Sequence, residues 1–118
     1  MEKEKYLETK EFVYDVLQPY FKKNTPAKIA TNDLFDEITE VNDLDLAMYF
    51  IATGIFQIER NILEKRIEEQ LTYWIYQFKK GVFNNDISDL DIIKKDIENI
   101  ESLIELRFED LDCYETDN

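Results

Sequence analysis

The sequence predicts an all-α fold, a single compact bundle of about five helices spanning residues 1–118. Only two glycines and two prolines occur, which are too few turn residues for a sandwich or barrel of many short strands. Apolar side chains recur three and four residues apart, which is the period of a helix rather than of a strand. A length of 118 residues and a hydrophobic fraction of 44% suit one domain with one core.

The first two helices are predicted at residues 3–18 and 32–41. The first carries apolar residues at helical spacing and should end near Pro19, because the residue before a proline disfavours the helical conformation. The following segment KKNTPAK has the composition of a connecting loop. Thr31 or Asn32 then offers an N-cap for the second, shorter helix.

The central helix is predicted at residues 43–59, with Asn42 as its N-cap. It is apolar on most faces, so neighbouring helices should surround it on several sides. Gly54 in its middle costs about 1 kcal/mol relative to alanine, and the usual compensation is close approach of another chain segment. We therefore expect a helix to cross near Gly54.

Two amphipathic helices are predicted at residues 62–80 and 89–111, after a break at Arg60 and Asn61. Gly81 follows two lysines and marks the end of the first. Ser88 and Asp91 resemble a capping box before the second, and residues 112–118 should fray.

Charge excludes several classes of partner. With 27 acidic and 14 basic residues the net charge is −13, which repels the phosphates of nucleic acids and anionic lipids. No apolar run is long enough to span a bilayer, and the first ten residues, MEKEKYLETK, have no apolar region of the signal-peptide type. The single cysteine, Cys113, cannot form an internal disulfide. We expect a cytoplasmic protein that binds neither nucleic acid nor membrane.

The residues of common active sites are missing, so we expect no enzymatic activity, no cofactor and no metal. The absence of histidine removes the commonest general base and zinc ligand. The glycines sit in no phosphate-binding loop. Asp86, Asp89 and Asp91 loosely resemble a calcium loop, but Ile97 stands where its bidentate glutamate belongs.

The strongest functional signal is acidic charge near the C-terminus. Residues 86–118 hold 12 acids and 3 bases, whereas residues 1–85 hold 15 acids and 11 bases. Helical spacing aligns five of these carboxylates in one stripe, namely Glu98, Glu101, Glu105, Glu109 and Asp112. Two interpretations are open: the stripe binds a basic partner, or it is a solvated face that keeps the protein soluble. Tyr73 and Tyr76, which flank the core residue Trp74, are additional candidate contacts.

The stretch from about residue 43 to 103 resembles small helical immunity proteins of bacterial polymorphic and contact-dependent toxin systems. The similar segments are AMYFIATGIFQIERNILEKRIEEQLTYWIYQFKKG and DIIKKDIENIESLI. In that family a helix that contains a glutamine is followed by a turn and by a helix that begins with leucine and ends in glycine. A final helix begins with charged residues. Gln57, Leu63, Gly81 and Lys94–Lys95 occupy these positions, although Arg60 and Asn61 replace a common turn glycine.

The resemblance implies a non-enzymatic inhibitor that binds a cognate toxin with a basic surface. Two alternatives remain: an acidic DNA mimic, encoded by a phage or plasmid, that inhibits a nucleic-acid enzyme of the host, and a homo-oligomeric helical interaction module.

Overall fold

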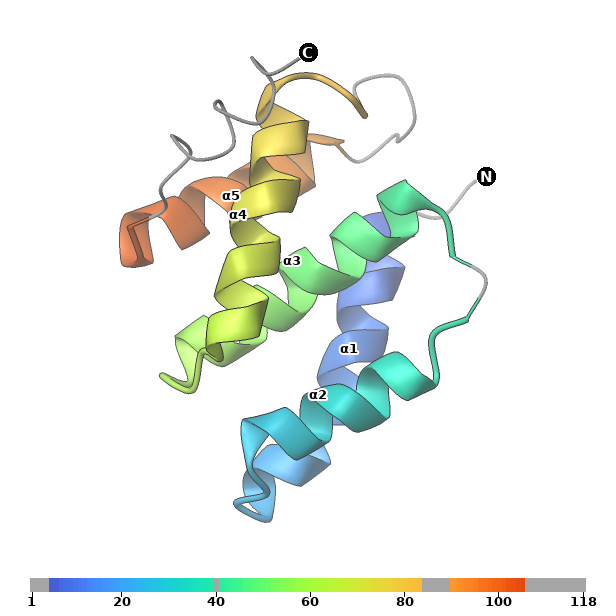
Figure 1. Cartoon of the computed structure of the whole chain (residues 1–118), viewed down its shortest axis with the longest axis vertical. Coiled ribbons are helices and arrows are strands. Elements are labelled where there is room, and N and C mark those ends of the chain that lie inside the picture. Colours follow the sequence, from blue (N-terminus) through green and yellow to red (C-terminus); the bar gives the residue numbers. More distant parts are fainter. Residues whose placement is uncertain (1–4, 40, 84–89, 106–118) are drawn as a thin grey trace.

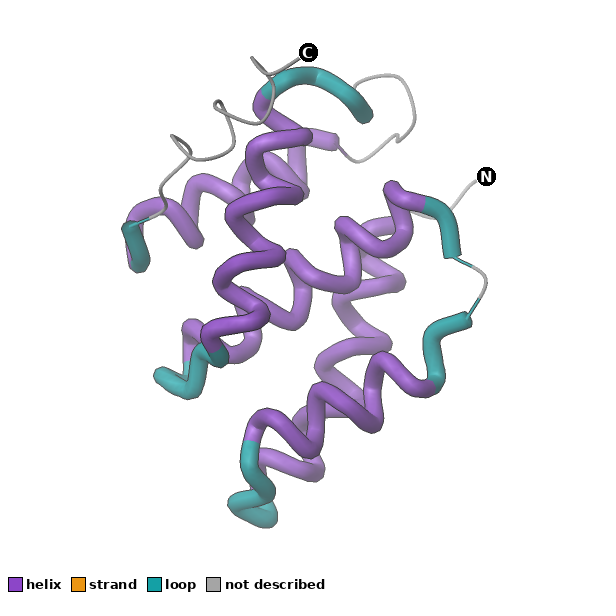
Figure 2. Tube along the Cα trace, in the orientation of Figure 1, coloured by secondary structure: helices purple, strands orange, loops and turns teal. Residues whose placement is uncertain are grey.

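Five helices make up the described part of the chain, which comprises residues 5–39, 41–83 and 90–105 of a computed structural model (Figures 1 and 2). No strand occurs in these residues, so the predicted all-α helical bundle is confirmed. The helices are α1 (Lys5–Lys22), α2 (Ala27–Asp36), α3 (Asp43–Glu59), α4 (Lys65–Lys79) and α5 (Leu90–Leu103).

The central position of α3 organises the bundle. It contacts α1, α4 and α5, while α2 packs on α1 (Figure 1). Its bounds agree with the prediction, and the predicted N-cap is confirmed because the Asn42 side chain accepts a hydrogen bond of 2.8 Å from the Asp45 amide. Seven consecutive residues, 51–57, are buried, which is expected of a helix that is covered on several sides.

Gly54 allows α4 to approach α3 closely. A Cβ atom built at Gly54 would lie 2.5 Å from Leu71 Cδ1, closer than van der Waals contact permits. Leu71 is a fully buried residue of α4. The predicted crossing of another helix near Gly54 is therefore confirmed.

The predicted bounds of α1 and α2 were wrong. Pro19 does not end α1, which continues for almost one more turn to Lys22. A proline inside a helix removes one backbone hydrogen bond, and the packing of Leu17 and Tyr20 against the core offsets this loss. Helix α2 starts at Ala27 rather than near residue 32, with Pro26 as the N-cap residue. Thr31 is no cap, since it lies buried inside α2.

Three helices end in the same hydrogen-bonding motif, with a residue of positive φ just beyond the helix. These residues are Asn24 (φ 58°), Asn61 (φ 58°) and Gly81 (φ 83°). In each case the next amide bonds a carbonyl five residues back, as in the bond of 3.0 Å from Thr25 to Tyr20, which is the Schellman pattern. The end of the fourth helix before Gly81 was predicted. The positive φ of Asn24 explains where α1 ends.

The last two helices are shorter than predicted. Helix α4 begins at Lys65 rather than at residue 62, because Arg60 to Glu64 form the turn and the N-cap. The expected helix 89–111 ends at Leu103 in the described residues, with residue 104 in a bend. Residues 89 and 106–111, Ser88 and the tail 112–118 lie outside the described residues. No described helix is long and apolar enough to cross a membrane.

Candidate protein-binding surface

Helix α5 turns its isoleucines toward the core and its glutamates toward solvent. Ile93, Ile97 and Ile100 are buried, whereas Glu98 is exposed, as is Glu105, which lies two residues beyond the end of α5. Glu101 is half-buried. The amphipathic pattern of α5 therefore places Glu98 at the surface and Glu101 at its edge. Glu109 and Asp112 lie outside the described residues.

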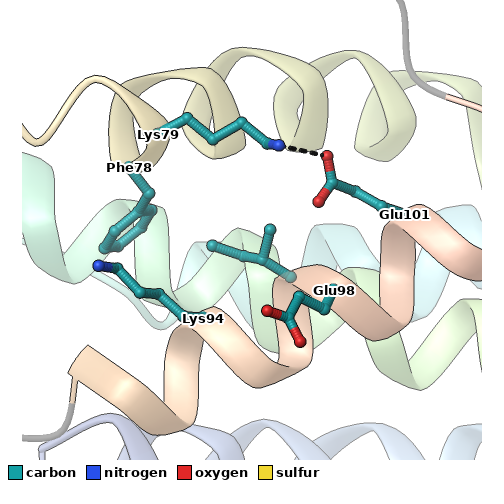
Figure 3. A pocket seen from close by; sticks show the side chains of 6 residues that line it. Phe78, Lys79, Lys94, Glu98 and Glu101 are labelled. Carbon is teal, nitrogen blue, oxygen red and sulfur yellow. Dashed lines mark ion pairs between the residues drawn. The ribbon is translucent and has the colours of Figure 1, made fainter.

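Two of these glutamates line a groove between α4 and α5 (Figure 3). The groove has a volume of about 240 Å³ and an apolar floor formed by Phe78 and Ile97. Lys79 Nζ lies 2.9 Å from Glu101 Oε2 and bridges the two helices, and Lys94 and Glu98 complete the lining. One carboxylate of the stripe is thus paired within the chain, while Glu98 borders the groove and remains exposed.

A buried acidic residue that the sequence did not single out fixes α5 to α1. Asp96 is 7% exposed; its Oδ2 accepts hydrogen bonds of 2.6 Å from the Tyr6 hydroxyl and 2.9 Å from Lys10 Nζ. The signal was present in the sequence, because Asp96 stands three residues after Ile93 and four before Ile100, on the apolar face. This pairing holds α5 against α1, and Glu98 of the same helix is exposed.

The two tyrosines on α4 differ in exposure. Tyr73 is 43% exposed, and its ring packs edge-on against Trp74 with centroids 4.8 Å apart. Tyr76 is half-buried and has the Lys80 ammonium 5.3 Å from its ring centroid. Trp74 is 7% exposed and belongs to the core, as predicted. Of these aromatic residues, Tyr73 offers the most open contact.

A buried polar network joins the turn between α3 and α4 to α2. Gln57, only 2% exposed, donates to the Thr31 hydroxyl oxygen at 3.0 Å and to Glu64 Oε2 at 3.1 Å. Thr31 donates to the same Glu64 oxygen at 2.6 Å. The glutamine noted in the family resemblance is therefore a structural residue here, and all three side chains are occupied by one another.

Arg60 fastens the end of α3 to α1. Its guanidinium carbon lies 3.6 Å from the centroid of the Phe56 ring, and it donates to Gln18 Oε1 at 3.0 Å. Nearby, the Tyr14 hydroxyl donates to Glu59 at 2.7 Å. Burial, this hydrogen bond and the charge of Glu59 raise the pKa of Tyr14 well above its ordinary value. Arg60 and Tyr14 therefore join α1 to the end of α3, and Tyr14 stays protonated at neutral pH.

The described surface carries carboxylates, lysines and the exposed ring of Tyr73, and tyrosine is enriched at protein interfaces. In the described residues no group of three or more histidine, cysteine, aspartate or glutamate side chains is arranged to hold a metal ion. Cys113 lies outside these residues. No protein-family model, curated protein sequence or solved structure matches the chain.

Proposed function

We propose that this protein is a non-enzymatic inhibitor that binds and neutralises a cognate bacterial toxin, with the carboxylate face of α5 toward a basic surface of the toxin. The observation that carries the proposal is the exposure of Glu98 on α5, where it borders the groove between α4 and α5, together with the exposure of Glu105 two residues beyond the end of that helix. The net charge of −13 adds a long-range attraction toward basic proteins.

The resemblance to immunity proteins supplies the class of partner, and electrostatics supplies the mechanism. A toxin that acts on nucleic acid needs a basic cleft, and an acidic inhibitor that covers such a cleft associates fast. The exposed carboxylates would steer the encounter and fix its register, while apolar side chains in the groove would contribute contact area. Such an inhibitor works by occupying the toxin and requires no catalytic group.

The pairing of charges along α5 favours a protein inhibitor over a DNA mimic. A DNA mimic needs a long, uninterrupted row of carboxylates spaced like phosphates. Among the described residues, Glu101 of α5 pairs with Lys79 of α4, and Lys94 of α5 lines the same groove. Mixed charges of this kind suit a protein surface with both basic and acidic groups.

Charge reversal tests the role of this face. Binding of the captured partner would be measured by surface plasmon resonance at several salt concentrations, using Glu98→Lys/Glu105→Lys. We expect the association rate to fall about tenfold at low salt, because rim charges act mainly on association. Glu11→Lys/Asp15→Lys on α1 is the matched control, since both of its residues are exposed and carry the same charge. Equal effects of the two double variants would remove α5 from the interface.

A further inference from the structure

A second groove lies between α2 and α4, and it carries chemistry that the proposed function does not use. In Figure 1, α4 crosses in front of α3, and α2 lies lower in the view. Side chains of all three helices line a space of about 300 Å³. Its lining shares no residue with the groove between α4 and α5. The two surfaces can therefore be tested independently.

Two stacked aromatic rings form the wall and the floor of this groove. Phe35 of α2 and Phe50 of α3 lie with ring centroids 4.7 Å apart and ring planes inclined by 27°. Both are half-buried, although Ile67 beside them is 1% exposed. The rings thus border open space, and the face of an aromatic ring attracts another ring or a cation.

One end of the groove is closed by groups that are already satisfied. Arg66 donates to the Lys28 carbonyl oxygen at 3.2 Å, and its Nε lies 3.3 Å from Glu64 Oε1. Glu64 also accepts the hydrogen bond from Thr31. These contacts join the N-terminal halves of α2 and α4, and they leave the cation of Arg66 held by a carboxylate.

The open side of the groove is acidic. Glu69 lines it and is exposed, and it takes part in none of the ion pairs found within the described residues. Asp36, which directly follows Phe35, is exposed and adds a negative charge near the groove, although it does not line the groove. An apolar floor bordered by the carboxylate of Glu69 complements an apolar side chain that has a cation next to it.

We propose that the groove between α2 and α4 binds an aromatic side chain of a protein partner that is flanked by lysine or arginine. The aromatic ring enters between Phe35 and Gln70 and packs on the stacked phenylalanines. The neighbouring cation of the partner pairs with Glu69. Aromatic anchors that fill pockets of this kind contribute much of the affinity of protein interfaces. The inference concerns a separate surface and does not depend on the proposed action on a toxin.

The test uses three short peptides as probes, Lys-Trp-Lys, Lys-Ala-Lys and Glu-Trp-Glu, titrated into the ¹⁵N-labelled full-length protein and followed by NMR. We expect Lys-Trp-Lys to shift the amide signals of Phe35, Phe50 and Gln70, and the other two peptides to bind at least about tenfold more weakly. Absence of shifts at these positions, or equal shifts with Lys-Ala-Lys, would overturn the proposal.

Two neighbouring glutamates of α4 provide a matched pair of variants. Glu69→Lys should weaken binding of Lys-Trp-Lys about threefold and strengthen binding of Glu-Trp-Glu, whereas Glu68→Lys should change neither. Both residues are exposed, but Glu69 alone of the two lines the groove. Equal effects of the two variants would show attraction by net charge alone, and the proposal would then fail. Both substitutions are at solvent-facing positions, and circular dichroism would verify that the variants fold.

Discussion

Gly54→Ala should have opposite effects on stability in two backgrounds. In the native protein the new methyl group would overlap the Leu71 side chain, with distances of 2.5, 2.6 and 2.9 Å to Cδ1, Cδ2 and Cγ. Leu71→Ala removes all three of these atoms. The same substitution at Gly54 therefore meets a filled site in one protein and a cavity in the other.

The expected magnitudes follow from two competing effects. Alanine stabilises a helix interior by about 1 kcal/mol relative to glycine. Overpacking of a close-packed core costs about 1–3 kcal/mol, and Leu71 is 0% exposed and has little room to move. We expect Gly54→Ala to destabilise the native protein by about 1 kcal/mol. In the Leu71→Ala background, which itself loses about 3 kcal/mol, it should stabilise by about 1 kcal/mol.

Urea unfolding of the four proteins, followed by far-ultraviolet circular dichroism, gives the free energy of unfolding of each. The two effects of Gly54→Ala should differ in sign, which corresponds to a coupling of about 2 kcal/mol between the sites. If Gly54→Ala stabilises the native protein, or if its effects in the two backgrounds are equal, α4 does not pack closely against α3 at Gly54.

Four further predictions concern contacts inside the bundle and on its surface. Asp96→Ala should lower the free energy of unfolding by about 3 kcal/mol, because it leaves a buried hydroxyl and an ammonium without their acceptor; a loss below 1 kcal/mol in urea unfolding would contradict this. Asn42→Ala should cost about 1 kcal/mol and Asn42→Asp much less, as checked by thermal unfolding, since aspartate also caps a helix. A double-mutant cycle on the partly exposed Lys79–Glu101 pair should give a coupling below about 1 kcal/mol, and a larger value would contradict the partial exposure of the two side chains. The raised pKa of Tyr14 means that the folded state keeps its proton where the unfolded chain loses it, so stability should fall as pH rises above about 10, and Tyr14→Phe should flatten this fall; identical alkaline profiles would refute it.

Periodicity predicted the presence of five helices because each buries a face whose apolar residues are close in sequence. Helix ends were harder, since they depend on contacts between distant residues. Thr31 has the side chain of an N-cap, yet it lies inside α2, where its hydroxyl donates to Glu64, the N-cap residue of α4. Pro19 predicts a helix end locally, but packing of the following turn and the stop at Asn24 decide the boundary.

The candidate binding surface was predictable only in part. The exposure of Glu98 follows from helical spacing alone, whereas the pairing of Glu101 with Lys79 depends on how α4 packs beside α5, and Glu105 lies beyond the end of the helix. The groove between α2 and α4 could not be predicted, because Phe35 and Phe50 meet only after the bundle folds.

Neutralisation of a toxin is the central claim, and a growth assay tests it most directly. The partner would first be isolated by affinity purification from the native host with the intact protein as bait and identified by mass spectrometry. Its gene would then be expressed in bacteria alone, with the native protein, and with the Glu98→Lys/Glu105→Lys variant. We predict that the partner alone stops growth, that the native protein restores it, and that the variant restores it poorly. A partner that is harmless alone, or one whose toxicity the native protein leaves unchanged, would contradict the proposed function.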